Sequence, residues 1–158
     1  MNRQSIVLAV ALVALCLQTP AASDVFAQAG GARPALPKVI AYKDPSCGCC
    51  GLWVEHMKRA GFAVTAVNTP DMTSVRREYG VPTPLQSCHT AVVDGFVVEG
   101  HVPADDVKRM LRERPKVVGL AVSGMPLGSP GMEQGNNKQP YKVLTFDQAG
   151  KTAVFSER

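Results

Sequence analysis

Three cysteines fall within four positions of the chain. Cys47, Cys49 and Cys50 stand in the sequence Cys-Gly-Cys-Cys, and Cys88 follows later beside His89. A Cys-x-x-Cys pair at the start of a helix suits thiol chemistry, because exposed N–H groups and the helix dipole favour thiolates. A third adjacent thiol invites mispairing during disulfide exchange, whereas three thiolates on one loop suit a soft metal such as Cu(I), or zinc. The cluster predicts a metal site, with thiol–disulfide exchange and structural disulfides (Cys47 with Cys50, Cys49 with Cys88) as the alternatives.

Two of the three histidines are candidate ligands beside the sulfurs. His89 follows Cys88 directly, although alternation along a strand would send the two side chains to opposite faces. His101 precedes an expected helix, where capping or loop packing is its alternative role. His56 lies seven residues along a helix from Cys49, a rise of about 10 Å. That distance is too great for a shared metal, so a surface role is expected for His56.

Met125 and Met132 are further candidates. They lie in a segment rich in glycine and proline, with too little apolar content for a core element. Thioethers on such a loop can serve Cu(I) without rigid geometry. The alternative is that both methionines plug a hydrophobic seam.

The elements that must position these residues form a mixed α/β pattern. Strands are expected over residues 38–42, 62–67, 88–93 and 96–99, and helices over 49–60, 72–79 and 103–114. Apolar residues recur at helical spacing after the cysteines, and Asp94-Gly95 is a strong signal for a two-residue hairpin turn. The order β-α-β-α-β-β-α predicts a thioredoxin-like α+β fold, in which the third strand begins beside the cysteine loop.

A C-terminal extension is expected from about residue 117. It comprises a loop over residues 119–139, rich in glycine, proline and methionine, and a hairpin of strands 141–146 and 152–155. A loop of about 20 residues is uncommon in a compact domain and is usually functional or disordered.

The N-terminus has the three-part layout of a secretory signal. A basic start precedes an apolar run over residues 6–17, and Ala27-Gln28-Ala29 provides a cleavage site. The apolar run is well short of the roughly 20 residues that a membrane-spanning helix needs. We therefore expect cleavage of residues 1–29, a linker over 30–37, and one exported domain over 38–158 without stable membrane insertion. In a Gram-negative bacterium this domain would be periplasmic, an oxidising compartment.

Composition excludes several classes of protein. The 158 residues are 46% hydrophobic and 19% charged, which is typical of one globular domain with a packed core. The net charge of +4 is scattered, and only 6% of residues are aromatic. Nucleic-acid binding is therefore not expected, because no basic surface interleaved with aromatic side chains is present.

Four ordered motifs give the chain a resemblance to a known family. They are Asp-Pro-Ser-Cys-Gly-Cys-Cys-Gly at 44–51, Ser-Cys-His-Thr at 87–90, Glu-Gly-His-Val-Pro at 99–103 and Gly-Met-Pro-Leu-Gly-Ser-Pro-Gly-Met-Glu at 124–133. Together they resemble the exported CopG-type copper-resistance proteins, over about residues 38–155. The resemblance implies a periplasmic, thioredoxin-like protein that binds copper and helps cells tolerate it, and it favours copper over zinc. The expected thiolate ligands are Cys47, Cys49, Cys50 and Cys88, with His89, His101, Met125 and Met132 as weaker candidates.

The leading hypothesis is therefore a protein that holds one or more Cu(I) ions on several thiolates. Several ions would form a multinuclear cluster, because a bridging sulfur can serve two metals. It would sequester copper or transfer it to an efflux or oxidase partner, and we assign it no catalytic residues. One alternative is a thiol–disulfide oxidoreductase with Cys47 as nucleophile and Cys50 as resolving thiol. The other is an interaction domain stapled by structural zinc or disulfides.

Overall fold

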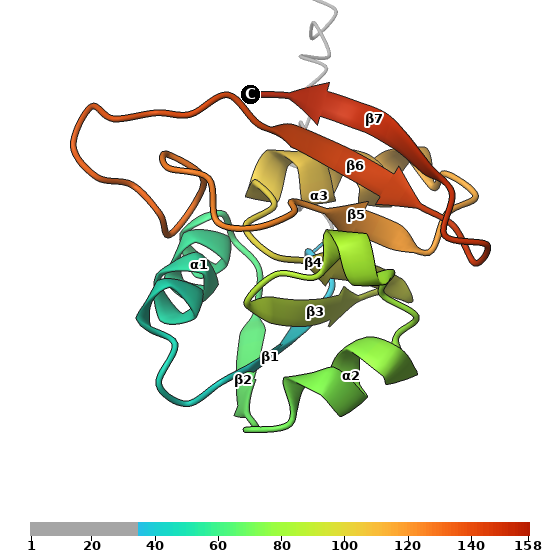
Figure 1. Ribbon diagram of the computed structural model, residues 1–158, viewed down its shortest axis with the longest axis horizontal. Coiled ribbons are helices and arrows are strands. Elements are labelled where there is room, and N and C mark those ends of the chain that lie inside the picture. Colours follow the sequence, from blue (N-terminus) through green and yellow to red (C-terminus); the bar gives the residue numbers. More distant parts are fainter. Residues whose placement is uncertain (1–34) are drawn as a thin grey trace, which may run out of the picture. The chain divides into compact units, whose positions relative to one another are not determined.

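One mixed sheet organises the part of the chain that the structure describes. The structure is a computed structural model and describes residues 35–158 (Figure 1). The predicted signal peptide and residues 30–34 of the predicted linker lie outside this range. Within it, seven strands form one sheet in the order β2-β1-β3-β4-β5-β6-β7. None of the helices over residues 35–158 has the length and apolar character needed to cross a membrane.

The elements agree closely with the periodicity of the sequence. The strands are β1 Val39–Lys43, β2 Val64–Asn68, β3 His89–Val93, β4 Phe96–Glu99, β5 Gly119–Ala121, β6 Lys142–Phe146 and β7 Thr152–Glu157. The helices are α1 Gly48–Arg59, α2 Met72–Glu78 and α3 Ala104–Glu113, with a short 3-10 helix, η1, at Thr83–Leu85. The expected order β-α-β-α-β-β-α is observed from β1 to α3, and the mixed α/β class is confirmed.

Strand pairing follows from the connections. Helix α1 connects the parallel neighbours β1 and β2, whereas β3 runs antiparallel to β1 and turns back into β4. Asp94 and Gly95 make that turn with φ of 49° and 84°, the left-handed conformation that such hairpins require. Helix α3 then leads to β5, which pairs parallel with β4, and the predicted hairpin β6–β7 completes the sheet.

Strand β5 was not expected, because residues 119–139 were predicted to be loop throughout. It has three residues, too few to show an alternating pattern. Gly119 explains why the strand can pair so closely with β4: a Cβ at this position would lie 1.9 Å from the carbonyl oxygen of Val97. The loop therefore begins after the strand, and from 122 to 141 it carries only an isolated bridge between Gln134 and Asn137.

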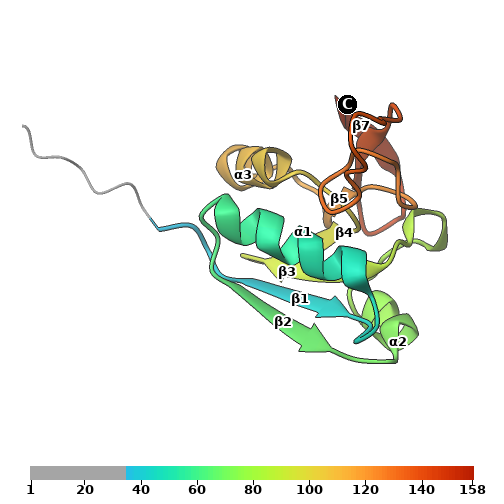
Figure 2. The same ribbon diagram turned by 90° about the vertical axis from the view of Figure 1, so that its left-hand side faces the viewer.

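The sheet separates two cores. Trp53 and Met57 of α1 and Val107 and Met110 of α3 pack with Val98 on one face. Helix α2 lies on the other face (Figure 2). A second cluster there is made of Val81, Leu85, Val97, Ala121 and Phe146. Full burial of an apolar side chain such as Val, Leu, Met or Phe stabilises the folded state by about 1.5–3 kcal/mol.

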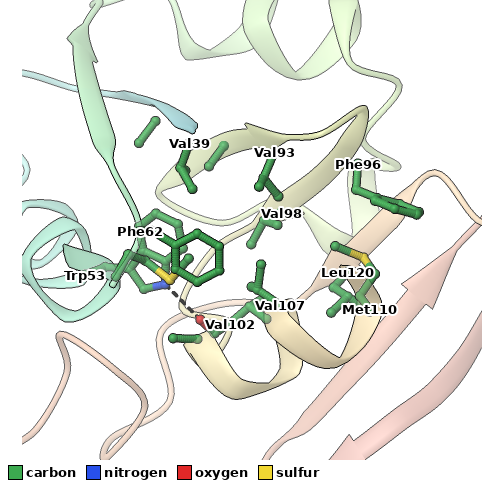
Figure 3. Packing of buried hydrophobic residues seen from close by; sticks show 14 of the residues in the cluster. Val39, Trp53, Phe62, Val93, Phe96, Val98, Val102, Val107, Met110 and Leu120 are labelled. Atoms are coloured by element: carbon green, nitrogen blue, oxygen red, sulfur yellow. Dashed lines mark hydrogen bonds between the residues drawn. The ribbon is translucent and has the colours of Figure 1, made fainter. Parts of the chain in front are cut away.

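Trp53 ties the first core to the segment that precedes α3. Its side chain is fully buried, and its indole N–H donates to the carbonyl oxygen of Val102 at 2.9 Å (Figure 3). Because α1 begins at the cysteine loop and Val102 follows His101, this bond holds two parts of the candidate site together.

Candidate metal centre

The first turn of α1 carries the three clustered cysteines. Asp44 shapes the preceding loop: its carboxylate accepts from the backbone N–H of Ser46 at 2.8 Å, and its carbonyl accepts from the N–H of Cys47 at 3.1 Å. Cys47 is the N-cap residue of α1 and makes no side-chain capping bond. The three sulfurs therefore stand at the positive end of the helix dipole.

Four sulfurs converge at this turn. Cys47 and Cys50 form a disulfide, as one of the sequence alternatives anticipated, whereas Cys49 and Cys88 are free thiols with their Sγ atoms 3.9 Å apart. Two thiolates that share a zinc ion at about 2.3 Å, with tetrahedral to trigonal angles, lie about 3.8–4.0 Å from each other. The Sγ atoms of Cys47, Cys49, Cys50 and Cys88 lie within 4.8 Å of one another. The free pair is already spaced for one shared ion.

Cys88 also belongs to a second group, with two histidines. Its Sγ lies 2.9 Å from Nε2 of His101 and 3.5 Å from Nδ1 of His89, and the two imidazole rings are nearly perpendicular at 88°. Burial, reinforced by Cys49, raises the pKa of the Cys88 thiol to about 12. The metal-free site therefore keeps this thiol protonated, and binding a metal would release the proton.

His101 has the tautomer that a ligand needs. Its Nδ1–H donates to the carbonyl oxygen of Pro130 at 2.8 Å, which leaves Nε2 unprotonated and facing the sulfur of Cys88. A backbone carbonyl on the second ring nitrogen is the usual support for a metal-binding histidine. Burial lowers the pKa of His101 and so keeps the ring neutral. Pro130 is part of the site, although nothing in the sequence marks a backbone carbonyl as a partner.

The capping role considered for His101 belongs to His56. The backbone N–H of Ala104, the first residue of α3, donates to Nε2 of His56 at 3.1 Å. His56 is half-buried rather than exposed, so the expected surface role is wrong, and burial lowers its pKa. Its placement outside the sulfur cluster agrees with the helical spacing.

His89 is fully buried and packs against Trp53, with ring centroids 4.4 Å apart and ring planes tilted by 44°. Burial, with a smaller contribution from His101, lowers the pKa of His89 to about 3. The expectation that His89 and Cys88 point to opposite faces is wrong. Cys88 precedes β3 and is not bound by strand alternation, so both side chains reach the same cluster.

The methionine segment lies against the first turn of α1. Gly131 has φ +86°, and a Cβ there would lie 2.7 Å from the carbonyl oxygen of Cys49, so the contact requires glycine. Met132 is half-buried, and Met125 is 52% exposed. That Met125 and Met132 act as thioether ligands stays a prediction.

Comparison with known proteins agrees with this geometry. A family described as "Protein of unknown function, DUF411" matches residues 85–132, which include Cys88 and His101. Two solved structures, described as copper resistance protein copG in Form 1 and Form 2, are each 45% identical to this chain with a TM-score of 0.74. Each match covers 78% of this chain and 98% of the solved one. This chain belongs to the CopG family of copper resistance proteins. No curated protein matches it.

Membership of the CopG family confirms the resemblance carried by the four motifs. Together with the cysteine group, it supports a copper-related role. The family match over residues 85–132 omits the Cys-Gly-Cys-Cys motif, whereas the structural matches extend over most of the chain.

Proposed function

We propose that this protein binds Cu(I) through thiolates and contributes to copper resistance by sequestering the ion or transferring it to an efflux or oxidase partner. The observation that supports this most is the spacing of the free sulfurs of Cys49 and Cys88, which lie 3.9 Å apart. Nε2 of His101 lies 2.9 Å from the sulfur of Cys88. Sulfur and imidazole are ligands that suit Cu(I). The relatives described as copper resistance proteins support copper over zinc.

Reduction of the Cys47–Cys50 disulfide is part of the proposal. In the disulfide neither sulfur is a thiolate. Because the four sulfurs lie within 4.8 Å of one another, reduction would add two ligands beside Cys49 and Cys88. Bridging sulfurs would then hold more than one Cu(I). We further propose that residues 1–29 direct export to the periplasm, which cell fractionation of the full chain would test.

The test is an anaerobic Cu(I) titration of the reduced protein lacking residues 1–29, in competition with a chelator of known affinity. We expect tight uptake of more than one Cu(I) per chain, and weaker uptake in Cys49→Ser and Cys88→Ser. A parallel Zn²⁺ titration serves as the control for metal preference. Absent uptake, or unchanged stoichiometry in both variants, would contradict the proposal.

A second candidate function is thiol–disulfide exchange, which the Cys47–Cys50 disulfide at the start of α1 favours. In this mechanism the reduced protein would attack a substrate disulfide through Cys47, and Cys50 would resolve the mixed disulfide. A reductase assay on a model disulfide protein separates the two functions. Exchange chemistry requires that Cys49→Ser stays active and Cys47→Ser is inactive, whereas Cu(I) binding requires that both variants bind Cu(I) more weakly than the unaltered protein.

A further inference from the structure

Glu99, the last residue of β4, is fully buried and holds the chain on both sides of Cys88. Its Oε1 accepts from the backbone N–H of Ser87 at 2.6 Å, and its Oε2 accepts from the hydroxyl of Thr90 at 2.6 Å. The residues between these two donors are Cys88 and His89. One carboxylate therefore spans the segment that carries two candidate ligands.

Arg76 of α2 holds the same segment and meets the carboxylate of Glu99 there. Its guanidinium donates to the carbonyl oxygen of Ser87, and its Nε lies 3.4 Å from Oε1 of Glu99. Ser87 is thus held through its N–H by a carboxylate and through its carbonyl by a guanidinium. The arginine side chain is only 15% exposed, so solvent screens this arrangement weakly.

A contribution to folding stability does not by itself explain a buried ion pair between Arg76 and Glu99. Removing two charges from water costs several kcal/mol, and well-packed apolar residues often stabilise a core as well or better. The pair does fix the backbone at Ser87, which lies outside the hydrogen-bonded strands of the sheet. Ser87 and Cys88 precede β3, and their neighbour Gly100 has φ +71° with Ser87 packed against its Cα.

We propose that Arg76 and Glu99 are positioning residues for the copper site, setting the sulfur of Cys88 against Cys49 and His101 without touching the metal. The inference rests on the proposed function and deepens it. Loss of either charge leaves the other buried without its partner and releases the Ser87 peptide. By analogy with other outer-shell partners of metal ligands, the expected loss of Cu(I) affinity is about 10–100-fold.

The experiment compares Arg76→Met with its neighbour Arg77→Met in the full chain. Arg77 is exposed, and among residues 35–158 its side chain donates only to the hydroxyl of Ser74, at 3.0 Å, so it controls for loss of a positive charge on α2. Thr90→Val, an isosteric change, removes one donor from Glu99. Two quantities are measured: Cu(I) affinity against a chelator, and the alkylation rate of Cys88 relative to Cys49 in reduced, metal-free protein at a temperature where every variant is folded.

We expect Arg76→Met to lower Cu(I) affinity by about 10–100-fold and to raise the relative alkylation rate of Cys88. Thr90→Val should move both quantities in the same direction by a smaller factor, and Arg77→Met should change neither. A purely structural role would lower the melting temperature of folded variants without changing the ratio of alkylation rates.

The two proposals fail in distinguishable ways. If the unaltered protein takes up no Cu(I), the proposed function is wrong, and the alkylation ratio still reports whether the pair positions Cys88. If Arg76→Met and Thr90→Val fold, bind Cu(I) as tightly as the unaltered protein and keep its alkylation ratio, the positioning role is overturned. Because Thr90→Val removes no charge, it carries this test even if Arg76→Met does not fold.

Discussion

The two halves of the candidate metal centre are held in different ways. The half at the start of α1 carries Cys47, Cys49 and Cys50 on a turn with no side-chain cap, where Gly48 faces open space. The other half, with Cys88, His89 and His101, is packed against neighbouring side chains and backbone.

The difference indicates a division of roles. The packed half has its ring orientations fixed, since the carbonyl of Pro130 holds His101 and the Trp53 ring packs against His89. The half on the helix turn can change its bonding. Cys47 and Cys50 form a disulfide, and the free thiol of Cys49 lies 3.5 Å from the sulfur of Cys47. We infer that the packed half sets the geometry and the helix turn responds to the redox state.

Substitution of one cysteine from each half tests this division most strongly. Cys88→Ser should lower Cu(I) affinity more than about 100-fold, above the loss usual for an outer-shell partner, because Cys88 belongs to both ligand groups. Cys47→Ser should lower it about tenfold, since three thiols remain. Anaerobic competition with a chelator measures both. An equal or larger loss in Cys47→Ser would contradict the division.

Glycine substitutions sharpen the same comparison without touching a ligand. A Cβ at Gly100 would lie 2.5 Å from the carbonyl oxygen of Val122, and its φ of +71° disfavours any other residue. Gly100→Ala should therefore cost about 2–4 kcal/mol of unfolding free energy. Gly48→Ala, in the first turn of α1 with nothing within 4 Å, should be neutral or stabilise by up to about 1 kcal/mol.

Urea unfolding of the reduced, metal-free protein measures both changes, and the unaltered protein is the reference. A loss in Gly48→Ala comparable to that in Gly100→Ala would mean that the helix turn is as tightly constrained as the packed half.

Much of the fold could be predicted because its signals are local. Trp53 and Met57 recur at helical spacing, and Asp94-Gly95 specifies the turn between β3 and β4. The cysteine cluster was equally visible, since three of its four sulfurs lie in one short motif. Strand β5 was missed because Gly119 is chosen for close approach to β4, a constraint that only the folded sheet reveals.

The packed half of the site was harder to predict for a physical reason. His101 could be a cap or a ligand until the carbonyl of Pro130, 29 residues away in sequence, fixed its tautomer. Arg76 stands beside the exposed Arg77 on α2 and carries no signal of its own, yet its guanidinium donates to the carbonyl oxygen of Ser87, 11 residues further along the chain. Long-range contacts of this kind leave no periodicity or motif in the chain.

The smallest effect expected is a pH dependence that originates in the packed half. Burial lowers the pKa of His89 to about 3, whereas an unfolded chain protonates histidine near pH 6.5. The unfolded state therefore binds the proton first, so stability is fully present above about pH 6.5 and falls as pH drops toward 3. His89 alone should lower the unfolding free energy by about 1 kcal/mol between pH 6.5 and 5.5.

His89→Phe should remove the part of the pH dependence of the unfolding free energy that comes from His89. Nε2 of His89 has no hydrogen-bond partner among the described residues, and the ring already packs against the aromatic ring of Trp53. Phenylalanine therefore suits this position and loses no hydrogen bond from that nitrogen. Burial also lowers the pKa values of His56 and His101, so a weaker slope of the same sign should remain. Urea titrations of reduced, metal-free protein at several pH values above the range of carboxylate protonation measure the difference. Equal slopes in the two proteins would mean that His89 accepts a proton in the folded state, and the packed half would then be no more shielded from solvent than the helix turn.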